Sequence, residues 1–220
     1  REWVEKGEAW AQRMMGQWYR DGNCGLKKSY VMARMLFEKA VAQGDPGAMC
    51  NLAFLYQDGQ GVVQSFKKAA ELFTMAAEQG DVSSIFNLGN MYREGQGVVE
   101  SHTKAAELFT MAAEQQGHVQ AMTTLAVMYI QGQGVAQSNE LAREWWTKAA
   151  NEGHETAIYN LKILDEEEAT ATTKTSTTTT TTTPSLRSCA ACNTPQTNDH
   201  PLNRCKCHSV HYCNSTCQRA

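Results

Sequence analysis

The stretch Lys-Ala-Ala-Glu-Leu-Phe-Thr-Met-Ala-Ala-Glu-Gln occupies residues 68–79 and returns unchanged at residues 104–115. More divergent versions lie at residues 33–43 and 142–152. Leucines at equivalent places are spaced by 36, 37 and 36 residues: Leu52, Leu88, Leu125 and Leu161. A fixed period of this length is typical of solenoids built from helix–turn–helix repeats. The sequence therefore predicts an all-α protein of stacked helix pairs.

Composition limits the classes of function. The 220 residues carry a net charge of −3, which gives no reason to expect a polyanionic partner. No apolar run approaches the roughly 20 residues needed to span a bilayer, and no charged-then-apolar leader is present. We therefore expect no membrane association and a cytoplasmic or nuclear location. Because the chain begins with Arg1 rather than Met, we expect a fragment or a processed form.

Three Gly-Gln-Gly loops punctuate the repeats, at residues 59–61, 95–97 and 132–134. Each follows a helix-period run that ends in a tyrosine. Glycine adopts a positive φ at low cost, so these loops are predicted to end one helix and return the chain toward the next. The valines just after them, Val62, Val98 and Val135, are expected to pack under the turn. A phosphate-binding loop is disfavoured, since the third glycine, the preceding strand and the lysine are missing.

Alanines, a Leu-Phe pair and Met75 or Met111 are predicted to form the buried face of the second helix of each repeat. In the last full repeat Trp145 and Trp146 replace the Leu-Phe pair. The first helix of the chain carries large apolar residues at helical spacing, and these are predicted to be core residues: Trp3, Trp10, Met14, Met15, Trp18 and Tyr19.

The boundaries between repeats carry recognisable helix-capping residues. Asp45, followed by Pro46, and Asp81 are suited to the N-cap position of the next helix. His118 and His154 stand at the same place in the later repeats. We interpret both histidines as surface residues of the cap region rather than as metal ligands or catalytic bases.

The combined pattern, from Asn-Leu-x3-Tyr through the glycine loop to the alanine-rich helix, resembles the Sel-one-like repeat, a branch of the tetratricopeptide-type solenoids. The resemblance covers residues 11–164, within a domain at residues 1–168. The repeats lie near residues 11–47, 48–83, 84–120 and 121–156, with a partial fifth at 157–168. The resemblance implies a right-handed α-solenoid that acts as a scaffold for proteins and has no catalytic residues of its own.

A threonine-rich segment follows the repeats, and we interpret residues 169–188 as a disordered linker. Such a segment has almost nothing to bury, so it cannot offset the roughly 1–2 kcal/mol that ordering each residue costs.

Six of the eight cysteines lie within residues 189–220, which suggests a small metal-stabilised module. About 30 residues with so little apolar content need a cross-link to fold. Thiolate pairs at short spacing favour zinc, whereas a disulfide framework is the alternative in a secreted protein. The ending Tyr212-Cys-x3-Cys-Gln resembles a MYND-type zinc finger. The resemblance implies that a first zinc is held by Cys189, Cys192, Cys213 and Cys217.

Cys205 and Cys207 would begin the second zinc site of such a finger. They are separated by one residue instead of the usual two, and the final ligands of the family would lie beyond Ala220. We therefore expect the finger to be incomplete at its C-terminus, with His208 or His211 as a remote substitute.

These features predict a non-enzymatic adaptor in which the repeats bind one protein and the finger binds proline-containing peptides. Nucleic acid is disfavoured, because a zinc ion held by four thiolates nearly cancels the small basic excess of the tail. Two alternatives remain open: a luminal adaptor of protein quality control, and a fragment of a larger enzyme whose catalytic domain is absent.

Overall fold

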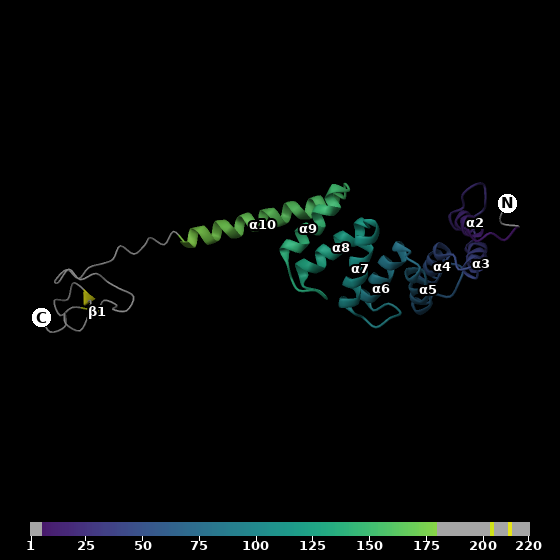
Figure 1. Ribbon diagram of the computed structural model, residues 1–220, viewed down its shortest axis with the longest axis horizontal. Helices are drawn as coiled ribbons and strands as arrows, with labels where there is room; N and C mark the ends of the chain where they lie inside the picture. The colour runs from purple at the N-terminus through teal and green to yellow at the C-terminus, as the bar shows by residue number, and fades with distance from the viewer. Residues whose placement is uncertain (1–5, 180–202, 205–210, 213–220) are drawn as a thin grey trace. The chain divides into compact units, whose positions relative to one another are not determined.

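The computed structural model describes residues 6–179, 203–204 and 211–212 (Figure 1). The chain divides into a unit at Arg1–Leu164 and a second unit at Asp165–Ala220. The elements are α2 (Ala9–Asp21), α3 (Tyr30–Val41), α4 (Pro46–Asp58), α5 (Phe66–Glu78), α6 (Val82–Glu94), α7 (His102–Gln116), α8 (Val119–Gln131), α9 (Asn139–Asn151), α10 (Glu155–Thr179), β1 (Asn203–Arg204) and β2 (His211–Tyr212).

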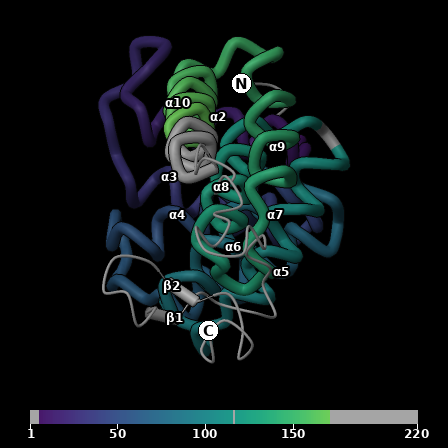
Figure 2. Tube along the Cα trace, turned by 90° about the vertical axis from the view of Figure 1, so that its left-hand side faces the viewer, coloured from purple at the N-terminus to yellow at the C-terminus, as the bar shows by residue number. Residues whose placement is uncertain are grey.

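The first unit is the predicted stack of helix pairs. Each even-numbered helix from α2 to α8 packs on the helix that follows it, and each of α3, α5 and α7 also packs on the next even-numbered helix. The helices α2 to α9 thus follow one another along the unit in chain order (Figure 1). In Figure 2, α5, α7 and α9 lie to one side of α4, α6 and α8. We call α2, α4, α6, α8 and α10 the first helices, and α3, α5, α7 and α9 the second helices.

The seam between the helices consists of small and aromatic side chains at fixed positions. Phe37, Phe73 and Phe109 are fully buried, and Trp146 takes their place in the fourth pair. Alanines flank each aromatic side chain and are also fully buried: Ala33, Ala40, Ala69, Ala76, Ala105, Ala112, Ala142 and Ala149. Small residues let the helix backbones approach closely while the aromatic ring fills the space between layers. This confirms the predicted role of the alanines and of the aromatic residue.

The glycine loops also have the predicted conformation. Gly59, Gly95 and Gly132 end their helices in the left-handed region, with φ of 69°, 66° and 67°. The N–H of Gly59 donates to the carbonyl of Leu55, which satisfies an acceptor at the end of α4. Val62, Val98 and Val135 are half-buried and pack against the core below each loop, as expected.

Two groups of residues that were predicted to lie in the core are exposed instead. Met75 and Met111 are 45% and 41% exposed, because they follow the buried phenylalanine by two residues and so point away from the seam. Trp10, Met14 and Trp18 are 47%, 39% and 37% exposed. The buried face of α2 is instead formed by small and polar residues: Ala11, Gln12 and Gly16. Trp3 lies outside the described residues.

The exposure of Trp18 follows from its position in the stack. Its equivalents in the later first helices, Leu55, Met91 and Met128, are almost fully buried, where a preceding helix pair covers them. No helix pair precedes α2 among the residues that the structure describes.

The last helix, α10, begins as the first helix of a fifth repeat, since Ala157 and Leu164 belong to the core. It continues to Thr179, so the first part of the segment predicted to be a disordered linker is helical. Glu166, Glu167 and Glu168, followed by Ala169, are good helix formers and support this continuation. The remainder of the predicted linker lies outside the described residues.

In the second unit, β1 and β2 form an antiparallel pair in which Asn203 faces Tyr212 and Arg204 faces His211. The other residues of the predicted zinc finger lie outside the described part of the chain. None of the helices in the described ranges is both long and apolar enough to cross a bilayer.

Candidate functional site: a groove lined by the first helices

At each boundary between repeats, one side chain caps the next first helix. An Asp45 oxygen accepts from the Ala48 N–H at 2.7 Å, and an Asp81 oxygen accepts from the Ser84 N–H at 2.8 Å. The Nδ1 atom of His118 accepts from the Ala121 N–H at 3.2 Å. The predicted N-cap role of Asp45 and Asp81 is therefore confirmed, and His118 caps α8 in the same way. We call Asp45, Asp81, His118 and His154 the junction residues.

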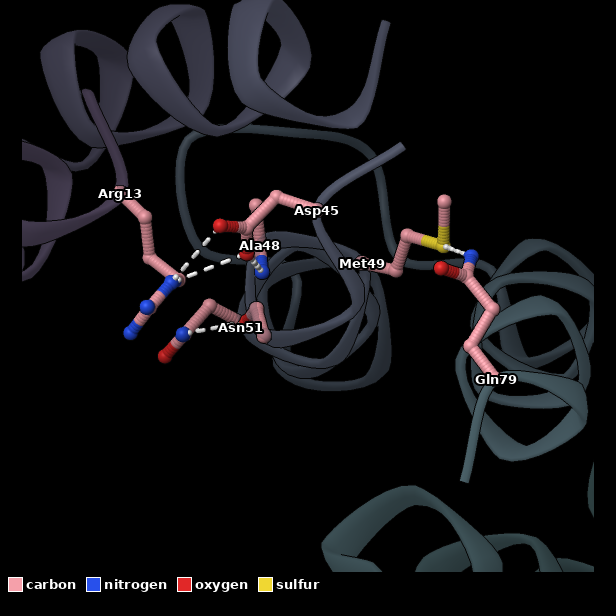
Figure 3. Close-up of polar contacts among 7 residues, drawn as sticks. Arg13, Asp45, Ala48, Met49, Asn51 and Gln79 are labelled. Carbon is pink, nitrogen blue, oxygen red and sulfur yellow. Dashed lines mark hydrogen bonds and ion pairs between the residues drawn. The ribbon is translucent and has the colours of Figure 1, made fainter. Parts of the chain in front are cut away.

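Each junction residue lies near one residue of the preceding first helix. Arg13 Nε lies 2.9 Å and 3.2 Å from the two carboxylate oxygens of Asp45 (Figure 3). The rings of Phe86 and His118 are stacked at 4.7 Å between centroids. Thr123 Oγ1 and His154 Nδ1 are 3.3 Å apart. The fourth pair, Cys50 and Asp81, lines a common hollow.

Two adjoining hollows lie along these contacts. The first, of about 530 Å³, is lined by residues that include Arg13, Cys50, Asn51, Phe54, Asp81 and His118. The second, of about 470 Å³, is lined by residues that include Gln57, Asn90, Arg93, Glu94, Thr124 and His154. Phe86, Asn87 and Gln120 line both hollows, so the two form one continuous groove. Its lining comes from α2, α4, α6 and α8 together with three of the junction residues.

Amide and hydroxyl side chains recur at one position of the first helices. Asn51 Nδ2 donates to the Gly47 carbonyl at 2.6 Å, and Asn87 Nδ2 donates to the Ser83 carbonyl at 2.7 Å. Thr124 Oγ1 donates to the Gln120 carbonyl at 2.8 Å. These bonds to the residue's own helix fix each side chain. The Asn87 amide keeps its oxygen and its second N–H for a ligand.

The arginines in and beside the groove are each held by an acidic neighbour. Arg13 pairs with Asp45, Arg20 Nε lies 2.8 Å from Asp21 Oδ1, and Arg93 lies 2.9 Å from Glu94 Oε1. The hydrogen bond from Arg20 lowers the pKa of Asp21. Arg20 Nη1 also donates to the Asn51 oxygen at 2.7 Å. The groove is thus polar but close to electrically neutral.

Two titratable groups of the groove are shifted toward their neutral forms. Burial raises the pKa of the Cys50 thiol to about 11, and the charge of the nearby Asp81 carboxylate acts in the same direction. Burial also lowers the pKa of His118. Within the described ranges, no three His, Cys, Asp or Glu side chains are grouped in a way that could hold a metal ion.

The cysteines predicted to bind zinc lie outside the described residues: Cys189, Cys192, Cys205, Cys207, Cys213 and Cys217. Their assembly around a metal therefore stays a prediction. The two cysteines of the repeats are both free, Cys24 exposed and Cys50 buried.

The groove is not among the features predicted from the sequence. We expected His118 and His154 to be surface residues, whereas both are half-buried and contact Phe86 and Thr123, respectively. A signal was present, because each junction residue follows its partner on the first helix by 31 or 32 residues. The partner residues differ from repeat to repeat, and for this reason no repeated motif marks them.

Comparison with known proteins agrees with this architecture. The sequence model of the Sel1 repeat matches residues 11–45, 46–81, 82–117 and 119–154, well over half of the chain. The chain belongs to the Sel1 repeat family. These four Sel1 repeats coincide with the pairs α2–α3, α4–α5, α6–α7 and α8–α9, and they confirm the repeats expected from the resemblance. Sel1 repeat proteins generally act as scaffolds for protein interactions and are generally not enzymes.

Several solved structures share the Sel1 fold. The protective antigen c5321 of uropathogenic Escherichia coli is 34% identical, with a TM-score of 0.69 over 72% of this chain and 33% of its own. A Sel1 repeat protein from Oxalobacter formigenes is 28% identical, with a TM-score of 0.66 over 71% of this chain and 63% of its own. The immunity protein Pa5087 from Pseudomonas aeruginosa is 25% identical, with a TM-score of 0.51 over 70% and 57%.

This chain therefore spans less than two thirds of the length of each of these relatives. No curated protein sequence matches it. The matches to the Sel1 repeat do not extend to the cysteine-rich tail.

Proposed function

We propose that this protein is a non-enzymatic adaptor whose Sel1 repeats bind a segment of another protein in the groove of the first helices. The observation that supports this most directly is the contrast between the two layers. Twelve residues of the second-helix segments, 68–79 and 104–115, are identical, whereas most groove positions of the first helices differ between repeats, as at Arg13, Cys50, Phe86 and Thr123. A binding surface on a repeat scaffold needs a framework that stays the same from repeat to repeat and a lining that varies.

The lining suits an extended segment recognised largely through its main chain. Asn51, Asn87 and Thr124 stand one repeat apart, and each can offer a hydrogen bond to a different main-chain group of an extended segment. Gln57 Oε1 lies buried at the second hollow and has no hydrogen-bond partner in the described part of the chain. Reorientation of the Gln57 side chain toward the hollow would let this oxygen accept from a main-chain N–H of the bound segment. Phe54 and Phe86 provide apolar contact for side chains of the partner.

The groove is tested with a random peptide library displayed on phage and selected against the full chain. Selected peptides are synthesised, and their affinities for the wild type and for Asn87→Ala are compared by calorimetry. Because Asn87 lines both hollows, we expect its loss to weaken binding by about tenfold. Asn139→Ala, at the exposed start of α9, is the matched control and leaves affinity unchanged. Equal affinities for the wild type and Asn87→Ala would contradict the proposal.

We further propose that residues 189–220 form a zinc-binding module, incomplete at its C-terminus, that recruits a second partner. The support is the spacing of Cys189, Cys192, Cys213 and Cys217, together with the reversal of the chain between β1 and β2. Zinc bound there would act as a structural cross-link. Proline-containing peptides are the ligand class that the resemblance to MYND-type fingers implies.

The zinc proposal predicts one tightly bound zinc ion per chain, measured by elemental analysis. Removal of the metal by a chelator abolishes peptide binding by the tail but leaves the helical circular dichroism of the repeats intact. Loss of the helical signal on chelation would contradict the separation into two modules. Mass spectrometry without reductant shows whether the six cysteines of the tail form disulfides. Disulfides there would favour the luminal alternative over the cytoplasmic or nuclear location.

A further inference from the structure

The first junction contains an ion pair that the second junction lacks. At the first junction, Arg13 of α2 pairs with Asp45, whose carboxylate at the same time caps α4 (Figure 3). The side chain of Asp45 is only 12% exposed. One carboxylate can therefore hold a helix N-terminus and an arginine together, although the dipole of the helix disfavours a nearby cation.

At the second junction the arginine is replaced by a small neutral side chain. Cys50 occupies the position on α4 that Arg13 occupies on α2, and Asp81 occupies the position of Asp45. Burial keeps the thiol of Cys50 uncharged, since it raises its pKa to about 11. Asp81 caps α6 through one oxygen, as Asp45 caps α4. The basic partner of the carboxylate is missing from this junction.

The neighbouring arginines do not replace it. Among the described residues, the ion pairs in and beside the groove join Arg13 to Asp45, Arg20 to Asp21 and Arg93 to Glu94, and Asp81 takes part in none of them. Arg20 is held further by Asn51, and Arg93 lies over the ring of Phe109 at 5.9 Å. Space for a ligand is available, because Cys50 and Asp81 both line the first hollow of about 530 Å³.

We propose that the first hollow binds a basic side chain, arginine or lysine, of the partner segment, with Asp81 as its counter-ion. The partner then supplies in trans the cation that Arg13 supplies within the chain at the first junction. The rings of Phe54 and Phe86, which line the same hollow, also favour a cation. This inference rests on the proposed function of the groove and specifies the partner that it accepts.

The requirement for a basic residue is confined to the first hollow. The third and fourth junctions carry His118 and His154 in place of an aspartate. In the second hollow, Glu94 is already paired with Arg93. A partner segment should therefore present one basic residue, next to uncharged residues that occupy the second hollow.

The test uses the same selection of phage-displayed random peptides against the full chain. We expect arginine or lysine to be enriched at one position of the selected peptides. Asp81→Asn keeps an N-cap, because asparagine caps helices well, but removes the charge. It should weaken the binding of such peptides by about tenfold or more. Replacing the basic residue of the peptide by norleucine should have the same effect on the wild type and little effect on Asp81→Asn.

Two further variants complete the design. Cys50→Arg places the missing cation within the chain, as at the first junction, and should abolish binding of basic peptides; it carries the test alone if Asp81→Asn does not fold. Asp58→Asn, at the exposed end of α4, removes the same charge outside the groove and leaves binding unchanged.

The outcomes separate the two proposals. The inference is overturned if the peptides that depend on Asn87 for binding carry no basic residue. It is also overturned if these peptides bind the wild type and Asp81→Asn with equal affinity. In both cases the proposed function still stands. Selection of no groove-binding peptide at all overturns both.

Discussion

Gly97 lies directly against the backbone of Phe66, at the first turn of α5, with no room for a side chain between them. The same contact joins Gly134 to His102 and Gly61 to Tyr30, where an added Cβ would lie 2.8 Å from the Tyr30 carbonyl carbon. The second glycine of each loop is thus required by the close approach of a neighbouring repeat, in addition to its φ of about 70°.

This contact predicts a large loss of stability for Gly97→Ala. Gly80 also has a positive φ, of 83°, but an added Cβ there meets nothing within 4 Å, so Gly80→Ala is the matched control. We expect Gly80→Ala to lower the free energy of unfolding by about 1–2 kcal/mol. Gly97→Ala should lose about 1–3 kcal/mol more, because the backbone of Phe66 must move. Equal losses in chemical denaturation would show that the contact is unimportant.

Ser84→Ala should stabilise the protein. Ser84 is fully buried, and its hydroxyl has no hydrogen-bond partner in the described part of the chain. At the equivalent positions of the other first helices Ala48, Ala121 and Ala157 are fully buried. Removing an unsatisfied hydroxyl should raise the free energy of unfolding by about 1 kcal/mol. The reverse change, Ala121→Ser, serves as the control and should lower it; a destabilised Ser84→Ala would show that the hydroxyl has a partner.

His118 should make the stability depend on pH. Its Nδ1 must be unprotonated to accept from the Ala121 N–H, and burial lowers its pKa below 6.5. The unfolded chain therefore binds a proton before the folded chain does. The contribution of His118 is complete above the unfolded pKa, near 6.5, and is lost as the pH falls through the folded pKa.

The measurement is the thermal midpoint of wild type and His118→Asn between neutral and mildly acidic pH. Asparagine caps the helix without titrating. As the pH falls below 6.5, the thermal midpoint of the wild type should decrease relative to that of His118→Asn. Parallel curves would show that the cap does not respond to pH.

The exposed methionines of the second helices should tolerate charge. Met75→Glu should change the free energy of unfolding by no more than about 0.5 kcal/mol, because Met75 is 45% exposed. Phe73→Ala, two residues earlier on the same helix, should cost about 3–5 kcal/mol, because Phe73 is fully buried. Chemical denaturation of both variants is the measurement. A large loss of stability in Met75→Glu would show that Met75 is buried, as expected from the sequence.

The repeat architecture was predictable because repetition amplifies weak local signals. One Gly-Gln-Gly loop indicates little, but three of them at a constant period, each followed by an alanine-rich helix, specify helix pairs. The N-caps at Asp45 and Asp81 were predictable for the same reason, since the same Gly-Asp step stands at both of these repeat boundaries.

The remaining features depend on tertiary contacts that periodicity does not carry. Trp18 has the spacing of a core residue, yet it is exposed because no preceding pair covers α2 in the described residues. The groove was not predictable from motifs, because its contacts join residues 31 or 32 positions apart with different chemistry each time: Arg13 with Asp45, Phe86 with His118, Thr123 with His154.

The glycine contacts between repeats have a consequence for how such a chain can evolve. They involve backbone atoms of Tyr30, Phe66 and His102, so the side chain at the start of the second helix is free to differ. A repeat can therefore be copied, exchanged or inserted without remaking its boundary. The identical residues at 68–79 and 104–115 are what a recent copying event would leave, and new partner specificity then requires changes in the first helices alone.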